Sequence, residues 1–480
     1  MILTKSKNLV RKCKMRRILI ANRGEIAIRI MQACKELGLD YVTVYTKEDE
    51  ASLHVERAIK EKGKNGAFRI ASYLDANELL EIADYTKCDA IHPGYGFLTE
   101  NHRFARRVAT RKRPLIFIGP RWEVLKEFGS KINTKCMAKR LSIPVIPGSD
   151  KPIYSEIEAE NIALELFHQQ WEEGIKKPSI LVKASVGSGG MGIEEVNHPI
   201  ELRRVYRRIK QYVKRQFGDE NVLLEKRFLT FNHIEVQLVC SQHGEAIHFG
   251  TRNCTIQSIS RQKRIEVAPA FNSNYKYRFD PEGVVKRAIQ YSLKLANYVG
   301  YDSVGTWEWI VTEEGGLYLL EVNPRIQVES GVSGCIAQIR HSSLGVDLVK
   351  EQIRIALGEK LGYKQKHISF NGASIEFRLV AEDTKRGFKP WGGTITKFHL
   401  PQYDWLKIYT HVPSDKPYPI PSDYDPNLAL AIVWGKDIEE VKRRGEKFLN
   451  EIEIEGKNQE SFIVTNIEFL KQSLPKIQRF

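Results

Sequence analysis

Two glutamates on either side of a Glu-Glu-Gly-Gly turn could together hold a divalent cation. If this turn has four residues and Thr312 faces Leu317, Glu308 lies directly opposite Glu321 across a β-hairpin. Side chains in such positions have Cβ atoms ~5 Å apart, and like charges there are destabilising. Because Mg²⁺ prefers carboxylates together with water and substrate phosphates, the pair predicts a magnesium site, to which Asn323 could add an oxygen. The alternative is an exposed hairpin face on which each glutamate pairs with its own lysine.

The residues that follow this hairpin alternate between polar and apolar side chains. The polar members are Glu321, Asn323, Arg325, Gln327 and Glu329. If the chain stays extended, these side chains share one face. A strand at a water-exposed sheet edge would show the same alternation. Combined with the glutamate pair, the pattern favours an anion-binding track, in which Arg325 binds a planar anion bidentately and Glu329 acts as a base.

A glycine-rich segment could cradle phosphates. Its glycines match G-x-G-x-x-G and are Gly187, Gly189, Gly190 and Gly192. In the dinucleotide-binding motif a helix begins inside the loop, but here the following residues Ile193–Val196 alternate like a strand. We therefore expect a β-hairpin whose backbone amides fold over phosphates, with Lys183 placed to reach an anion. A plain glycine-rich hairpin with a surface lysine is the alternative.

The first part of the chain alternates strands and helices, which indicates a parallel sheet. The expected strands are Arg17–Ala21, Tyr41–Tyr45, Ala90–Ile91 and Leu115–Ile118, and the first helix spans Gly24–Leu37. The turn-rich residues 92–96 follow a strand, at the edge where open α/β sheets place their ligands.

The rest of the chain has the pattern of mixed α+β structure. We expect a helix over Lys131–Leu141, a strand over Ser179–Ser185 and a helix from about Ile200, then antiparallel strands at Ile234–Val239, Ala246–Gly250, Thr306–Thr312 and Leu317–Asn323. A third region after Gly331 begins with a helix near Leu344–Leu357 and is rich in strands from Ala373 onward.

Composition places the chain among ordinary globular proteins. It has 480 residues, of which 42% are hydrophobic and 28% charged, values that exclude collagen, coiled-coil rods and wholesale disorder; the length suggests about three domains. No apolar run approaches the roughly 18 residues of a membrane span. Seven scattered cysteines without C-x-x-C spacing indicate a reducing compartment and no structural zinc, so we expect a cytoplasmic protein.

The net charge of +15 is concentrated in basic segments. Residues 1–17 carry no acid and could be a solvated tail, a transit peptide or a mis-assigned start before Met15. A second basic run lies between Arg203 and Arg215, with the spacing of an exposed helix face. It lacks an aromatic platform, so we do not expect nucleic-acid binding, but it could steer an acidic protein partner.

Longer segments carry a family resemblance. They are ILIANRGEIA from Ile18, IHPGYGFLTEN from Ile91, KAS with its glycine loop from Lys183, EVNPRIQVE from Glu321 and EFRLVAED from Glu376. In this order they resemble the biotin carboxylase subunit or domain of biotin-dependent carboxylases, in the ATP-grasp superfamily. The resemblance covers about residues 15–470. It implies a basic tail over residues 1–14 and a parallel α/β N-terminal domain over 15–128. It further implies an antiparallel ATP-grasp domain over 129–330, with a lid at about 145–222, and a strand-rich C-terminal biotin carboxylase domain over 331–480.

The resemblance also implies a reaction. ATP phosphorylates bicarbonate to carboxyphosphate, which then yields CO₂ to carboxylate the ureido N1′ of biotin. The metal is Mg²⁺, with Mn²⁺ as an alternative, and biotin is a carrier-bound substrate. No Ala-Met-Lys-Met biotinylation signature is present, so we expect a subunit that works with a separate biotin carboxyl carrier protein and a carboxyltransferase subunit of an acyl-CoA or pyruvate-type carboxylase. The resemblance also implies that the chain forms a homodimer, and it implies no association with a membrane.

Matching the family's motifs assigns roles residue by residue. ATP would be bound by Lys131, Lys183, the four glycines Gly187, Gly189, Gly190 and Gly192, Glu225, Lys226, His233 and Gln257; the metal by Glu308, Glu321 and Asn323; and bicarbonate by Arg325, Gln327, Val328 and Lys263. Glu329 would deprotonate bicarbonate, and Arg378 would stabilise the biotin enolate. Phosphoryl transfer depends on such positioning and charge compensation. The stability of an enolate depends in the same way on a preorganised cation beside its oxygen.

Three departures from the family pattern bear on activity. The segment Gln257–Lys263 is one residue longer than expected and lacks a histidine, so the register of Lys263 is open. Ser330 stands where the family has a histidine, and Leu430 where it has a lysine. Another ATP-grasp carboxylate ligase, or a catalytically altered relative, therefore remains as an alternative function.

Overall fold

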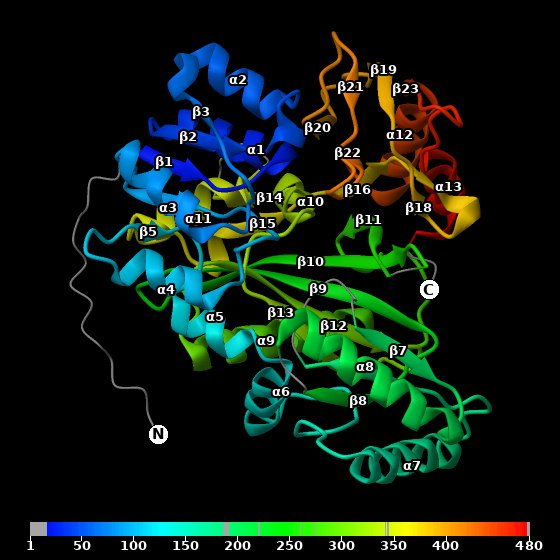
Figure 1. Cartoon of the computed structure of the whole chain (residues 1–480). Helices are drawn as coiled ribbons and strands as arrows, with labels where there is room; N and C mark the ends of the chain where they lie inside the picture. The colour runs from blue at the N-terminus through cyan, green and yellow to red at the C-terminus, as the bar shows by residue number, and fades with distance from the viewer. Residues whose placement is uncertain are drawn as a thin grey trace.

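A computed structural model describes residues 17–185, 192–218, 221–259, 261–272, 274–340, 342 and 345–477 (Figure 1). The expected basic tail and the loop glycines Gly187, Gly189 and Gly190 lie outside the described residues. Figure 1 shows the N-terminal lobe in blue and the C-terminal strands in orange, both beside the long green strands of the central region.

The N-terminal lobe is a parallel sheet with strand order β3-β2-β1-β4-β5. Its strands are β1 Arg17–Ile20, β2 Asp40–Tyr45, β3 Ala67–Arg69, β4 Ala90–His92 and β5 Ile116–Phe117. Its helices are α1 Gly24–Glu36, α2 Leu53–Lys62, α3 Ala76–Tyr85, α4 His102–Thr110 and α5 Trp122–Phe128. The predicted strand–helix–strand unit is confirmed, and the turn after β4 leads toward the central sheet.

A three-stranded sheet follows, and it has the expected hairpin. Helix α6 (Lys131–Arg140) precedes the sheet, whose strands β6 Ile180–Ala184, β7 Ile193–Val196 and β8 Val222–Lys226 are covered by helices α7 Glu156–Glu172 and α8 Leu202–Phe217. Strand β6 pairs antiparallel with β7, with Lys183 opposite Ile193. The strand–loop–strand context predicted for the glycine segment is confirmed at both of its flanks.

The largest sheet joins regions that the sequence presented as separate. Its order is β13-β12-β9-β10-β11-β16-β22-β20, all antiparallel. The strands are β9 Phe231–Cys240, β10 Ala246–Gln257, β11 Lys263–Ala268, β12 Val304–Thr312, β13 Leu317–Asn323, β16 Ala373–Val380, β20 Leu406–Thr410 and β22 Asn427–Gly435. Pairing of β11 with β16 carries the central sheet into the third region.

The hairpin of β12 and β13 contains a bulge that sequence reasoning did not foresee. Val311, rather than Thr312, pairs with Leu317, and the register shifts beyond Trp309, so that Glu308 still pairs with Glu321. The side chains of Leu317 and Leu319 join the apolar core. A regular alternation would send Glu321 into that core as well, and the extra residue turns it to the opposite face.

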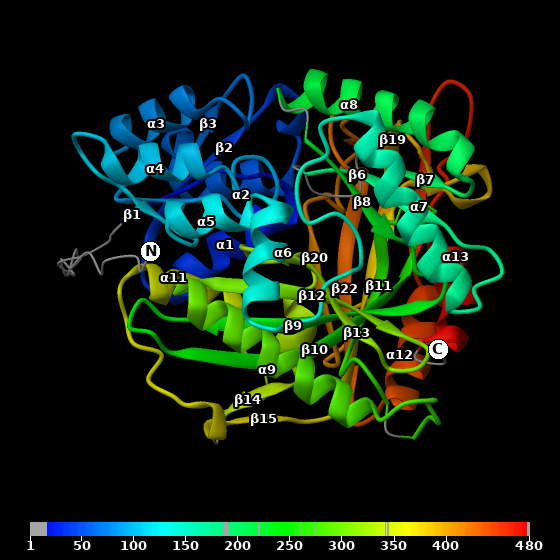
Figure 2. The ribbon, with the colours of Figure 1, turned by 90° about the horizontal axis from the view of Figure 1, so that it is seen from below.

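The remaining elements close the fold. The helices are α9 Pro281–Val299, which lies along β9 and β10 (Figure 2), α10 Ser330–Ile336, α11 Leu348–Ala356, α12 Ile438–Asn450 and α13 Ile467–Ser473. The strands are β14 Ala337–Ile339, β15 Ile368–Phe370, β17 Glu382–Asp383, β18 Lys389–Pro390, β19 Thr394–His399, β21 Tyr418–Pro419 and β23 Glu453–Lys457. Short 3₁₀ turns lie at 47–49, 63–65, 199–201, 365–367, 384–386 and 474–476. Within the described residues, no helix is long and apolar enough to cross a membrane.

Trp307 tests how much the core behind the site contributes to stability. Its side chain is fully buried, with ring centroids 5.0 Å from Tyr301 and 6.2 Å from Phe128. We expect Trp307→Ala to lower the free energy of unfolding by about 3–5 kcal/mol, because it removes apolar contacts and leaves a cavity. Urea unfolding followed by circular dichroism measures this. Trp171→Ala, at a tryptophan that is 53% exposed, is the matched control, and equal losses in both variants would contradict the prediction.

Candidate active site

Three glutamates form a row across the central sheet. Glu321 on β13 lies opposite Glu308 on β12, which lies opposite Glu235 on β9, which lies opposite Arg252 on β10. Glu235 is fully buried and Glu308 is 4% exposed. Because residues in register on neighbouring strands share a face of the sheet, this row concentrates negative charge where water cannot screen it, and it requires cations.

Lys263 supplies one of these cations. Its Nζ lies 2.9 Å from a carboxylate oxygen of Glu308 and 2.9 Å from one of Glu329, and it also forms an ion pair with Glu235. Burial alone would lower the pKa of Lys263, but these carboxylates raise it well above its usual value. Lys263 pairs opposite Gln257 in the β10–β11 hairpin, and its charge lies at the centre of the cluster.

Arg252 supplies the second cation, and sequence reasoning missed it together with Glu235. The guanidinium is fully buried and lies 2.8 Å from Glu235 and 2.8 Å from the side-chain oxygen of Gln237. A signal was available in β9, where His233, Glu235 and Gln237 alternate with apolar residues. That alternation places the three polar side chains on one face.

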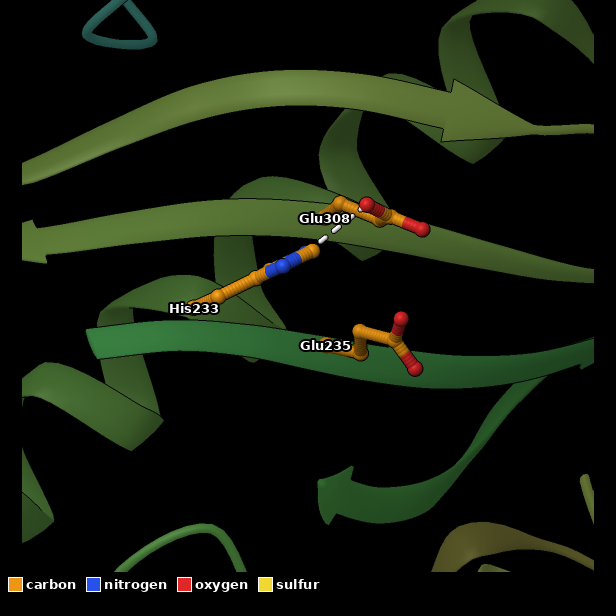
Figure 3. A group of neighbouring side chains, drawn as sticks. All are labelled: His233, Glu235 and Glu308. Atoms are coloured by element: carbon orange, nitrogen blue, oxygen red, sulfur yellow. Dashed lines mark ion pairs between the residues drawn. The ribbon is translucent and has the colours of Figure 1, made fainter. Parts of the chain in front are cut away.

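His233 bridges the row to the segment before Lys263. Its Nδ1 lies 2.9 Å from the side-chain nitrogen of Gln257, and its Nε2 lies 2.7 Å from Glu308. Figure 3 shows His233 reaching toward Glu308, with Glu235 on the same strand as His233. The ligand atoms of these three residues lie within 4.8 Å of one another, but the Lys263 ammonium already lies between Glu235 and Glu308. This trio therefore suits Mg²⁺, which prefers oxygen ligands, less well than the predicted hairpin pair.

The predicted metal residues lie together. Oε1 of Glu308 accepts hydrogen bonds from Asn323 at 2.7 Å and Gln327 at 3.0 Å. Glu321, by contrast, has no hydrogen bond or ion pair to its carboxyl group among the described residues, and burial together with Glu308 raises its pKa. An unpaired carboxyl beside an ionised one is what a divalent cation would neutralise, so this oxygen-rich group fits Mg²⁺.

The predicted extended track is wrong beyond Asn323. Strand β13 ends there, because Pro324 has no N–H for the ladder and the N–H of Arg325 turns back to the Asn323 carbonyl at 2.8 Å. Glu329 instead directly precedes helix α10. The side chains of Gln327 and Glu329 still reach Lys263.

Glu329 lies between two cations. Its carboxylate contacts Lys263 at 2.9 Å and Arg378 at 3.0 Å, and it is 1% exposed. Burial alone would raise the pKa of Glu329, but Lys263, Arg378 and Arg252 hold it below its usual value. The group is therefore ionised at neutral pH. Arg325 lies apart from it, with Nε 2.6 Å from Glu100 of the turn-rich loop after β4.

Several residues assigned to the nucleotide lie on or beside the three-stranded sheet of β6, β7 and β8, whereas His233 and Gln257 lie on the eight-stranded sheet. Lys183 on β6 lies 2.6 Å from Glu225 on β8, and Lys226 pairs with Glu173. The backbone N–H of Lys131 donates to the Ser185 carbonyl at 3.3 Å. Gly192 has a φ of +71°, and a Cβ there would lie 3.2 Å from both Ala184 and Tyr212. Lys131, Lys183 and Gly192 thus lie at the C-terminal end of β6, whereas Lys226 lies opposite Ile180 at its other end.

Family models match the chain in three successive parts. They are described as biotin carboxylase, N-terminal domain, over residues 14–125; carbamoyl-phosphate synthase L chain, ATP binding domain, over residues 130–364; and biotin carboxylase C-terminal domain, over residues 376–478. The chain belongs to the biotin carboxylase family. It is accordingly an ATP-dependent ligase.

Relatives and solved structures agree with the family models. The 2-oxoglutarate carboxylase small subunit of Hydrogenobacter thermophilus is 39% identical over 92% of this chain and 87% of its own length. A pyruvate carboxylase subunit of Methanothermobacter thermautotrophicus is 38% identical over 92% of this chain and 84% of its own length. The biotin carboxylase domain dimer of the Hydrogenobacter enzyme, solved with MgADP, ADP and bicarbonate, superposes with a TM-score of 0.84 at 37% identity, covering 96% of this chain and 94% of that chain.

Two of the departures from the biotin carboxylase pattern lie around Arg378. Leu430 is fully buried directly opposite Arg378, and Ser330 accepts a hydrogen bond from Arg29 at 3.1 Å. Arg378 also forms an ion pair with Glu266.

Glu376 pairs in register with Glu266, is fully buried, and has no hydrogen bond to either carboxyl oxygen. Burial and then Glu266 raise the pKa of Glu376 well above its usual value, against Arg378.

Glu376 therefore makes stability depend on pH. Below the ordinary glutamate pKa of 4.5 the group is protonated in both the folded and unfolded states. As pH rises, the unfolded state loses its proton first, so the free energy of unfolding falls until the folded group also ionises. We expect Glu376→Gln to remove part of this decline and to be more stable than the wild type at pH 8, with little difference between the two at pH 4.

Thermal unfolding between pH 4 and pH 8 measures this difference. Glu359→Gln makes the same chemical change at an exposed side chain and should leave the pH dependence of the wild type unchanged. A Glu376→Gln curve parallel to that of the wild type would show that Glu376 is ionised in the folded protein at neutral pH, contrary to the prediction.

Proposed function

We propose that this chain carboxylates biotin on a separate carrier protein, using ATP and bicarbonate, with carboxyphosphate as the intermediate. The observation that carries the proposal is the placement of Glu329, buried and ionised between Lys263 and Arg378 beside the glutamate row. Relatives described as carboxylase subunits, and a solved relative that holds MgADP and bicarbonate, support the same reaction.

The first step is phosphorylation of bicarbonate. Glu329 takes the bicarbonate proton, which raises the nucleophilicity of the oxygen that attacks the γ-phosphorus of ATP, and ADP leaves. Lys263, Arg325, Gln327 and the backbone of Val328 would hold the anion beside this base. Phosphoryl transfer needs positioning and charge compensation more than covalent help, which suits a site built from lysines, an arginine and a glycine turn.

The nucleotide would bind across the two sheets. Lys131 and Lys183 would contact its phosphates under the glycine segment, with Glu225 and Lys226 toward the base and with His233 and Gln257 lining the site. Glu308, Glu321 and Asn323 would hold Mg²⁺, or alternatively Mn²⁺, and the bound ion would neutralise phosphate charge. When ATP arrives, Lys183 exchanges its internal partner Glu225 at 2.6 Å for a phosphate.

The second step uses Arg378. Carboxyphosphate yields CO₂ and phosphate, the released phosphate takes the ureido N1′ proton of biotin, and N1′ then attacks CO₂. Arg378 would stabilise the negative charge that develops on the ureido oxygen. Its guanidinium is oriented by Glu266 and by Glu329 at 3.0 Å, so the same carboxylate that serves as base also positions this cation.

The assembly follows from the same proposal. The chain would act with a biotin carboxyl carrier protein and a carboxyltransferase subunit of a pyruvate, 2-oxoglutarate or acyl-CoA type carboxylase, and would form a homodimer. The three domains would span residues 15–128, 129–330, with a lid at about 145–222, and 331–480.

Replacing the base tests the reaction. We expect Glu329→Gln to lower bicarbonate-dependent ATP hydrolysis by about 10²- to 10⁴-fold, the usual contribution of a positioned base, while ATP binding is retained. A coupled ATPase assay with and without bicarbonate and free biotin measures the first, and isothermal calorimetry the second. The matched control is Glu359→Gln. Full turnover in Glu329→Gln would refute the base, and ATPase activity that responds to another carboxylic acid but not to bicarbonate would favour a different ATP-grasp ligase.

Replacing the unpaired carboxyl tests the metal site. Glu321→Gln removes one of two carboxylate ligands, so the Mg²⁺ concentration for half-maximal ATPase activity should rise by about tenfold or more. Titration with Mg²⁺ at saturating ATP measures this change, and Glu313→Gln, at an exposed glutamate in the same hairpin, is the control. An unchanged Mg²⁺ requirement would remove Glu321 from the metal site.

A further inference from the structure

A basic hollow lies between helices α4 and α5, outside the site described above. It has a volume of about 510 Å³ and is lined by His102, Arg103, Arg106, Arg107, Trp122 and Lys126. Figure 1 shows the two helices side by side at the edge of the N-terminal lobe. None of these lining residues is acidic, so the hollow presents positive charge together with one aromatic ring.

The cations of the hollow lack acidic partners. In the described part of the chain, no ion pair involves Arg103, Arg106, Arg107 or Lys126. Arg107 donates only to the side-chain oxygen of Asn77, at 2.7 Å, and Arg106 lies over the ring of Trp122 at 5.2 Å. Charges without internal partners are available to an external one.

The basic face of α8, which the sequence suggested as a docking surface, differs in this respect. Arg203 pairs with Glu160, Arg207 with Glu156, and Arg208 with Glu194. A partner that bound there would have to displace these carboxylates. The α4–α5 hollow therefore has the stronger unsatisfied positive charge of the two surfaces.

Both walls of the hollow continue directly into the proposed active site. Helix α4 begins at His102, two residues after Glu100, which lies 2.6 Å from Arg325. Helix α5 ends at Phe128, three residues before Lys131, the proposed phosphate ligand. The two helices that line the hollow are thus continuous in sequence with two segments of the proposed active site.

We propose that this hollow docks an acidic surface of the biotin carrier protein, an inference that rests on the function proposed above. The carrier is the macromolecule that must approach this site. Arginine binds carboxylates bidentately, and arginine and tryptophan are enriched at protein interfaces. Because Arg106 covers a face of the Trp122 ring, stacking of a nucleobase there is disfavoured, which argues for a protein partner over a nucleic acid.

Charge reversal tests the docking surface. The triple variant Arg103→Glu, Arg106→Glu, Lys126→Glu should lower kcat/KM for the biotinylated carrier protein of the same organism by about tenfold or more and remove most of its salt dependence, because steered association depends on complementary charge. With free biotin as substrate, kcat/KM should be unchanged. The neutral variant with glutamine at the three positions should give a smaller loss and covers the case in which the reversed variant does not fold.

A second triple variant controls for overall charge. Lys64→Glu, Lys360→Glu, Lys366→Glu changes exposed lysines elsewhere, and either triple variant lowers the net charge by 3 × 2 = 6, from +15 to +9. Equal losses in both variants, an equal loss with free biotin, or no loss with the carrier would overturn the proposal. Binding of a different partner would also overturn the proposal. In that case the wild type binds a single-stranded oligonucleotide or an anionic lipid vesicle in a salt-sensitive way, the hollow variant alone loses this binding, and the carrier reaction is unaffected. Absence of wild-type activity with both the biotinylated carrier protein and free biotin would instead refute the proposed function.

Discussion

The site depends on three carboxylates that the sheet holds in a single row. Glu321, Glu308 and Glu235 are in register on neighbouring strands, where like charges repel and burial strengthens the repulsion. Arg252 and Lys263 offset the charge at one end, and the carboxyl group at the other end is left for a bound cation. The row therefore explains why a lysine, an arginine and a metal would converge on one face of a β-sheet.

A continuous sheet brings these groups together from distant parts of the chain. Strand β11 carries Lys263 and pairs with β16, which carries Arg378. Both cations contact Glu329, so the base and the cation proposed for biotin are positioned by the pairing of these two strands. The domain boundary expected at residue 330 therefore separates Lys263 from Arg378, although both residues lie on one sheet.

The sequence allowed the local features of the site to be predicted, and the distant ones only in part. The pairing of Glu308 with Glu321 was predicted correctly from a turn that was placed one residue off, because the bulge compensates for the error. The extended track failed at Pro324, whose missing N–H was a visible signal. Arg252 was missed although Glu235 and Gln237 lie on the preceding strand β9, because its other partners, Thr306 and Ser333, come from distant parts of the chain. The unpaired Glu376 was equally hidden, because its isolation depends on Ile432, which lies opposite it on β22, and on burial by other strands.

The bulge in the β12–β13 hairpin limits how this segment can evolve. Apolar side chains before the bulge, such as Leu319, and after it, such as Val322, both enter the core although they are an odd number of residues apart. A single-residue deletion between them would exchange the inward and outward sets, placing the Glu321 carboxylate among tryptophans and Val322 on the face that carries Glu308 and Glu235. Homologous chains can therefore differ freely in the length of the turn, whereas the spacing from Leu319 to Glu321 must be inherited unchanged.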